Sequence, residues 1–205
     1  MNVVLLQGNE GPETYGQLAD IHRQEIHEGF LSTLGPDFLS LLYESLARSE
    51  SAFALVEKDG DMVQGFIVGA MDTGAVYKEF FRKAGARALP VLLPKLLSPA
   101  RVRRVFETLL YPKSKSSDGL PEPEILNFCV RSELQGKGVG SRLFEALCAE
   151  FGRRGVTQIR IVTGAGQKSA QVFYQAKGAT LAANVQVHKD SQSLVYVYDI
   201  EPGVP

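Results

Sequence analysis

The sequence predicts one α/β (α+β) domain, in which helices cover the faces of a mixed sheet. Two patterns predict this class. The first is a set of short runs, apolar throughout or alternating with polar residues, which are typical of strands. The second is a set of stretches with apolar residues at every third or fourth position, which are typical of amphipathic helices. With 205 residues, of which 44% are hydrophobic and 22% charged, the chain can bury one sizeable core. We therefore expect residues 1–205 to form a single domain.

The N-terminal part predicts a strand, two helices and a hairpin. The second helix is expected to open at Pro36, because proline suits the first turn of a helix. The hairpin is indicated by Asp59-Gly60, a pair that supplies the positive-φ positions of a tight turn between strands. The expected elements are a strand at 2–7, helices at 13–28 and 36–48, and strands at 52–57 and 62–70.

Residues 72–123 form an insertion of a different character. Prolines at positions 90, 94, 99 and 112 predict short helical pieces rather than one long helix. Residues 72–121 hold ten Lys/Arg and four Asp/Glu, so that a segment of charge +6 sits on a remainder of −7. Such a segment fits a helical lid, a set of phosphate contacts, or a docking surface for a membrane or a partner. Its position before the next strand favours the lid.

The C-terminal part returns to alternating strands and helices. The first helix there is expected to end near Gly152, and the second is stopped by Gly178. The expected elements are a strand at 125–130, a helix at 139–151, a strand at 158–162, a helix at 169–177, and a closing hairpin at 180–188 and 193–199.

The stretch Gln135-Gly136-Lys137-Gly138-Val139-Gly140-Ser141 places glycines at alternate positions between a strand and a helix. Backbone N–H groups of such a turn converge on one anion, and the helix adds its positive end, so the expected ligand is a phosphate or pyrophosphate. A nucleotide-binding P-loop does not fit, because Lys137 is followed by Gly138 rather than by Ser or Thr. The net charge of −1 gives no bulk attraction to nucleic acid.

Two segments resemble motifs of the GCN5-related N-acetyltransferase (GNAT) family. Residues Gln135 to Gly140 resemble its Q/R-x-x-G-x-G/A motif, and Ala170 to Ala179 resemble its A-x-x-F-Y-x-x-x-G-F segment. The resemblance implies a GNAT-like, mostly antiparallel sheet with a helical insertion between the third and fourth strands. It also implies acetyl-CoA as the acyl donor. Gln167, where the family usually has asparagine, and Ala179, where it usually has phenylalanine, depart from the pattern.

The resemblance also assigns roles to individual residues. Contacts with the donor are implied for Phe128, Cys129, Val130, Gln135, Gly136, Lys137, Gly138, Val139, Gly140, Ser141, Gln167, Ala170 and Phe173.

Two residues are candidates for proton transfer. Glu124 opens the strand before the glycine turn in a Glu-Ile context similar to that of the catalytic base in some family members; the alternative is a solvated glutamate. Tyr174 matches the family's tyrosine acid, which protonates the departing thiolate; the alternative is a core tyrosine.

The expected function is transfer of an acetyl group to a primary amine of a small molecule, an amino sugar or an amino-acid-like metabolite, by direct attack in a ternary complex. A non-catalytic acyl-CoA-binding module and a protein or peptide N-acetyltransferase are the alternatives. Cys129 as an acyl carrier is the rival mechanism, but its mid-strand position disfavours the thiolate. Glu25 and His27 are candidates for the acceptor pocket, although a solvated helix face is the more common arrangement.

The remaining features concern metals and compartment. His22 and His27 lie five positions apart, on different faces of one helix, so no zinc site is expected. Two free thiols, Cys129 and Cys148, suit a reducing cytosol, and we expect a cytoplasmic protein because the first residues lack the pattern of a signal peptide. The longest apolar run, at 88–97, is too short to span a bilayer. The oligomeric state is left open, with a homodimer as one option.

Overall fold

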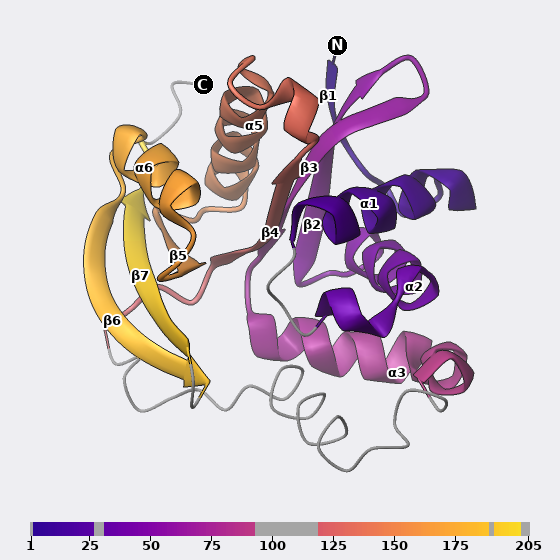
Figure 1. Cartoon of the computed structure of the whole chain (residues 1–205). Coiled ribbons are helices and arrows are strands. Elements are labelled where there is room, and N and C mark those ends of the chain that lie inside the picture. Colours follow the sequence, from indigo (N-terminus) through magenta and orange to yellow (C-terminus); the bar gives the residue numbers. More distant parts are fainter. Residues whose placement is uncertain (1, 27–30, 93–118, 189–190, 202–205) are drawn as a thin grey trace.

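The protein is built on a sheet of seven strands in the order β1-β2-β3-β4-β5-β7-β6, with helices on both faces (Figure 1). The computed structural model describes residues 2–26, 31–92, 119–188 and 191–201. Its elements are β1 (Asn2–Leu5), α1 (Pro12–Glu25), η1 (Leu31–Leu34), α2 (Pro36–Ala47), β2 (Ala52–Asp59), β3 (Met62–Ala70), α3 (Thr73–Leu92), β4 (Glu124–Val130), η4 (Ser132–Leu134), α5 (Val139–Arg153), β5 (Gln158–Gly164), α6 (Lys168–Ala176), β6 (Thr180–His188) and β7 (Ser191–Asp199).

Neighbouring strands are antiparallel except for β4 and β5. The predicted mixed, mostly antiparallel sheet is therefore confirmed. The parallel pair is joined at two positions only, Glu124 with Arg160 and Ile125 with Ile161. Since β4 continues to Val130 and β5 to Gly164, the two strands separate beyond this short contact and leave a gap in the middle of the sheet.

Each face of the sheet carries its own core. The α2-side core lies under α1, α2 and α3, and the α5-side core lies under α5 and α6 (Figure 1). Side chains of β4 contribute to both, because successive residues of a strand point to opposite faces. Cys129 belongs to the α2-side core, whereas Val130 belongs to the α5-side core and Phe128 packs against it. The side chains of β4 thus flank the gap on both faces.

The insertion differs from the prediction in its first part. Residues 73–92 form one helix, α3, with Pro90 in its last turn. A stripe of buried residues at every fourth position holds this helix against α2, and burial of that stripe outweighs the cost of one proline of about 3 kcal/mol. The stripe consists of Val76, Phe80, Ala84, Ala88 and Leu92. The predicted pieces around Pro94, Pro99 and Pro112 lie outside the described residues.

Smaller differences concern element ends. The first helix ends at Glu25, three residues before the predicted end. The hairpin turn is shorter than expected, since β2 runs to Asp59 and Gly60 has φ +58 at the first loop position, the glycine position of a II′-type turn. Cys129 and Cys148 are free, as predicted. Within the described part of the chain, no helix combines the length and apolar character that a membrane crossing needs.

Gly69 marks the tightest packing between β3 and α5. A Cβ atom there would lie 2.6 Å from Cζ of Phe53 and 2.7 Å from Cζ of Phe151, whose rings already pack edge to face at 4.8 Å. We expect Gly69→Ala to lower the free energy of unfolding by about 1–3 kcal/mol, because neither buried ring has room to move. Chemical denaturation measures this loss. Gly16→Ala is the matched control, since no atom lies within 4 Å of its Cβ position in α1 and the helix should gain about 0.5–1 kcal/mol. Equal effects of the two substitutions would contradict the packing argument.

Candidate active site

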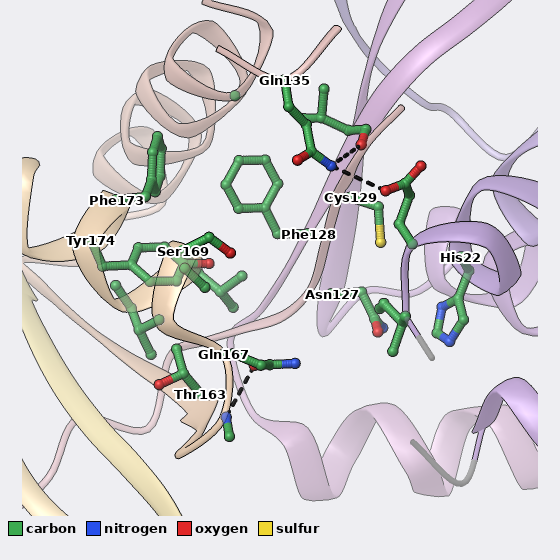
Figure 2. A pocket seen from close by; sticks show the side chains of 18 of the residues that line it. His22, Asn127, Phe128, Cys129, Gln135, Thr163, Gln167, Ser169, Phe173 and Tyr174 are labelled. Atoms are coloured by element: carbon green, nitrogen blue, oxygen red, sulfur yellow. Dashed lines mark hydrogen bonds between the residues drawn. The ribbon is translucent and has the colours of Figure 1, made fainter. Parts of the chain in front are cut away.

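A cavity of about 860 Å³ occupies the gap between β4 and β5 (Figure 2). Its walls come from β4, β5, the glycine turn, the start of α6, and α1 with η1. Leu126 and Cys129, which line it, belong with the α2-side core, whereas Phe128 and Tyr174 belong with the α5-side core. The cavity therefore extends through the sheet from one face to the other.

Most of the residues predicted for the site line this cavity. They are Phe128, Cys129, Val130, Gln135, Gly136, Gly138, Gly140, Ser141, Gln167, Ala170, Phe173 and Tyr174. Three predicted residues lie elsewhere. The side chain of Val139 is buried in the α5-side core, Lys137 is exposed, and Glu124 lies at the closed end of the gap, where β4 and β5 are still paired.

The glycine turn has the geometry of an anion site. Gly136 and Gly138 have φ of +74 and +83, in the left-handed region that favours glycine. Gly138 caps α5, and the first bond of the helix runs from Arg142 N to the carbonyl oxygen of Gly138 at 3.1 Å. The N–H groups of Val139, Gly140 and Ser141 therefore have no acceptor inside the helix. Together with the positive end of the helix, they provide donors for a phosphate.

The backbone of β4 presents further donors and acceptors to the cavity. Arg131 N donates to Gln64 O at 3.0 Å, so these two residues form a hydrogen-bonded pair between β4 and β3. In an antiparallel pair of strands, every second residue pair is of this kind. Phe128 and Val130 fall in the intervening pairs, opposite Ile67 and Gly65. Their N–H and C=O groups consequently point away from β3 and toward the gap, where an extended ligand can pair with them as an added strand would.

A hydrogen-bonded link joins the glycine turn to α1. The Gln135 side chain donates to the carbonyl oxygen of Val130 and to Glu25 Oε2, both at 3.0 Å, and Ser132 N donates to Glu25 Oε1 at 2.9 Å. Glu25 lines the cavity and is half-buried. It is therefore not a purely solvated residue of a helix face, which was the more common arrangement expected from the sequence; His27 lies outside the described residues.

Tyr174 lies on the α6 wall of the cavity (Figure 2). Its ring packs among those of Phe173, Phe144 and Phe128, with centroid distances of 5.4, 6.0 and 6.3 Å. Burial, with a smaller contribution from Cys129, holds the pKa of the phenol well above its usual value. The hydroxyl therefore keeps its proton at neutral pH and is available as a donor.

Gln167 occupies the start of α6. Its Oε1 accepts a hydrogen bond from Gly164 N at 3.0 Å (Figure 2), which leaves the amide N–H₂ group to donate to a ligand in the cavity. The substitution of asparagine by glutamine thus keeps a donor at this wall. Ala179 is buried and donates its N–H to the carbonyl oxygen of Tyr174 at 2.9 Å, so the small side chain is accommodated beside the helix end.

Glu124 is held in an ion pair. Arg160 donates from Nε at 2.8 Å and from Nη2, and both bonds end on Oε2 of Glu124. Burial raises the pKa of Glu124, and the neighbouring Arg160 opposes that rise. Glu124 also adds to burial in raising the pKa of Tyr77 in α3. Its neighbour Ile125 belongs to the α5-side core, so alternation along the strand turns the Glu124 side chain to the opposite face, on which α3 lies. Sequence reasoning did not foresee the arginine partner.

His22 is a cavity residue that sequence reasoning gave no role. Its side chain is 2% exposed, and Nδ1 lies 2.5 Å from Tyr43 Oη in α2. Burial lowers the pKa of His22 to about 4, so the ring is neutral at physiological pH. Among the described residues Nε2 is buried without a partner. The sequence offered no signal for this pairing, because Tyr43 lies on another helix.

The described residues contain no group of three His, Cys, Asp or Glu suited to a metal ion.

Comparisons with solved structures give related folds at low sequence identity. An aminoglycoside 6′-N-acetyltransferase complexed with coenzyme A has 15% identity and a TM-score of 0.62, with 100% of both chains covered. The ribosomal-protein-S18-alanine N-acetyltransferase from Escherichia coli has 13% identity and a TM-score of 0.57, covering 97% of this chain and 94% of that one. Ard1 from Thermoplasma volcanium has 17% identity and a TM-score of 0.59, covering 98% and 99%.

The comparison with protein families is more direct. No curated protein sequence matches the chain, but residues 17–179 match the family described as the Acetyltransferase (GNAT) family. This match includes most of α1, the gap between β4 and β5, the glycine turn and α6. The chain therefore belongs to the GNAT family of acetyltransferases.

Proposed function

We propose that the protein transfers the acetyl group of acetyl-CoA to a primary amine of a small molecule, an amino sugar or an amino-acid-like metabolite, by direct attack in a ternary complex. The observation that carries the proposal is the cavity through the sheet. The glycine turn and the phenol of Tyr174 lie toward one face, and a separate wall from α1 lies toward the other. Two ligands can therefore meet in the gap from opposite sides.

The residues on the α5 side fit a CoA donor. The turn from Gly136 to Ser141 would bind the pyrophosphate through N–H groups that lack partners within α5. Phe128 and Val130 would pair with the amide groups of the pantetheine arm, and one of their N–H groups would polarise the thioester carbonyl. Gln167 would add a donor from α6.

Proton transfer is assigned to two residues on opposite sides of the gap. Tyr174 would protonate the departing thiolate, because its buried phenol retains its proton. Glu124 would take the ammonium proton through a water molecule, since it does not line the cavity and Arg160 engages only its Oε2. Its raised pKa makes it a better base than an exposed carboxylate.

A covalent route through Cys129 is disfavoured by its environment. The side chain is 4% exposed, and burial, with a smaller contribution from Glu25, raises the pKa of the thiol far above neutrality. Because the thiolate is the nucleophilic form, direct attack by the amine is the simpler mechanism.

The proposal is tested by release of free thiol from acetyl-CoA in the presence of an amine panel. The panel holds an aminoglycoside, glucosamine, an amino-acid amide and a short peptide. Thiol release with one of the first three, and a product heavier by one acetyl group, would support the small-molecule acceptor. Release with the peptide alone would indicate a protein or peptide N-acetyltransferase. Tight CoA binding with no release would indicate a non-catalytic module.

Gly138 allows a test of the anion site with a matched pair of variants. Asparagine and aspartate have the same size, and both tolerate positive φ better than most residues do. We expect Gly138→Asp to weaken CoA binding roughly tenfold or more relative to Gly138→Asn, because it places a carboxylate beside the pyrophosphate. Isothermal titration with CoA measures the difference. Equal affinities of the two variants would rule out pyrophosphate binding at this turn.

Tyr174→Phe tests the acid. Loss of the phenol proton should lower kcat by about 10²- to 10⁴-fold while the dissociation constant of CoA stays unchanged. Tyr198→Phe is the control, since Tyr198 packs on the same Phe144 ring at 5.1 Å but does not line the cavity. Thiol release is measured with an amine from the panel at saturation. Wild-type turnover in the Tyr174 variant would remove the assignment.

Glu124→Gln tests the base. In the wild type, kcat/KM should fall as the pH drops through the raised pKa of Glu124, which lies above the ordinary value of 4.5, because the protonated carboxyl accepts no proton. The variant should lack this acidic limb and have a rate lower by about 10²- to 10³-fold. Glu150→Gln is the control, as Glu150 is a buried carboxylate bound by Arg153 and Arg154. An unchanged rate and pH profile, with lower stability only, would mean that Glu124 serves the ion pair alone.

A further inference from the structure

The imidazole of His22 contributes to the α1 wall of the cavity. The side chain is 98% buried and lines the cavity, yet Nε2 has no hydrogen-bond partner among the described residues. A buried polar group without a partner costs about 1–3 kcal/mol. Such a cost in a ligand-binding cavity points to a ligand atom as the missing partner.

The hydrogen bond between His22 and Tyr43 decides whether Nε2 of His22 carries the ring proton. Tyr43 is 0% exposed, and in the described part of the chain its Oη has His22 Nδ1 as its hydrogen-bond partner, at 2.5 Å. If Nδ1 carried the ring proton, the proton of the Tyr43 hydroxyl would lack an acceptor and the lone pair of Nε2 would lack a donor. If the hydroxyl donates to Nδ1, Nε2–H alone is unmatched. The second arrangement leaves fewer buried groups unpaired, so the ring presents an N–H donor.

His22 lies on the side of the cavity proposed for the amine substrate, rather than on the side proposed for acetyl-CoA. Figure 2 shows His22 on the side of β4 that lies opposite Tyr174 and Phe173, with Asn127 and Cys129 between. Cys129 and Tyr43 belong to the α2-side core, whereas Tyr174 belongs to the α5-side core. Glu25, one helical turn along α1, adds a carboxylate to the same wall. An amine that approaches from this face meets both a negative charge and a neutral donor.

We propose that His22 Nε2–H binds an oxygen atom of the acceptor, so that the enzyme selects amines that carry a hydroxyl or carbonyl oxygen close to the amino group. Tyr43 acts as a positioning residue, because its hydroxyl fixes the tautomer and the ring orientation. Burial keeps the imidazole neutral, so the donor is the same across the pH range in which the enzyme works. This inference rests on the proposed acetyl transfer and specifies the class of its acceptor.

Two pairs of amines of matched shape test the selection. 2-Aminoethanol differs from propylamine, and 3-aminopropan-1-ol from butylamine, by a hydroxyl in place of a methyl group. In the wild type, at least one hydroxylated amine should have a kcat/KM roughly tenfold or more above that of its partner, because the hydrocarbon leaves the buried N–H unpaired. Equal kcat/KM values within both pairs would overturn the proposal.

Two variants of equal side-chain length test whether His22 is responsible. His22→Met removes the donor, whereas His22→Gln retains an N–H near the position of Nε2. The preference should disappear in His22→Met and persist in part in His22→Gln, while CoA affinity, which also reports folding, stays at the wild-type level in both. Persistence of the full preference in His22→Met would overturn the proposal. If neither variant folds, Tyr43→Phe should lower the preference through loss of the fixed tautomer, and an unchanged preference in that variant would overturn it equally.

A binding measurement separates this inference from the proposed catalysis. The chain contains three histidines, and nitrogen-15 spectra of the labelled protein with CoA distinguish the ring tautomers; His22→Gln assigns the signal. We expect a neutral ring protonated at Nε2, with a signal that shifts on addition of the hydroxylated amine and not of its hydrocarbon partner. This result without any thiol release would refute the proposed catalysis and leave His22 as a ligand-binding residue. A ring protonated at Nδ1, or no selective shift, would overturn the inference.

Discussion

The site depends on the brief contact between β4 and β5. Two parallel strands that paired along their whole length would close the sheet and satisfy their own backbone groups. Here pairing stops after Ile125 and Ile161, and the N–H and C=O groups of Phe128 and Val130, which point away from β3, face a cavity instead of a neighbouring strand. Unpaired backbone in the middle of a sheet costs free energy unless something binds to it. The gap therefore makes the fold incomplete in a way that an extended, amide-containing ligand can complete.

Several side-chain contacts hold the margins of the gap in place. Glu25 and Gln135 connect α1 to the glycine turn and to the carbonyl oxygen of Val130, and His22 connects α1 to α2 through Tyr43. At the closed end, Arg160 and Glu124 bridge β5 and β4. Each contact joins elements that are distant in the sequence. They give the cavity fixed walls, which is a condition for orienting two reactants.

Local patterns in the sequence predicted the fold well, but they could not predict which side chains from different elements would contact each other. Strand and helix periodicity predicted the element order, and Pro36 marked the start of α2. The anion site predicted from the glycine turn stays a prediction. The continuous α3 was missed because its buried stripe outweighs the local effect of Pro90. The partners Arg160 for Glu124, and Tyr43 for His22, could not be predicted because those pairs form only when the sheet and the helices assemble. The roles of Glu124 and Tyr174 stay predictions.

The passage of the cavity through the sheet has a consequence for inhibitor design. A molecule that joins a CoA moiety to an acceptor mimic would benefit from the high effective concentration of two linked ligands. With the two ligands bound as proposed, its connecting atoms would cross the sheet between β4 and β5, at the level where Phe128 packs on one face and Cys129 on the other. A slender, unbranched linker suits that crossing, and a bulky or cyclic linker would have to force the two strands apart.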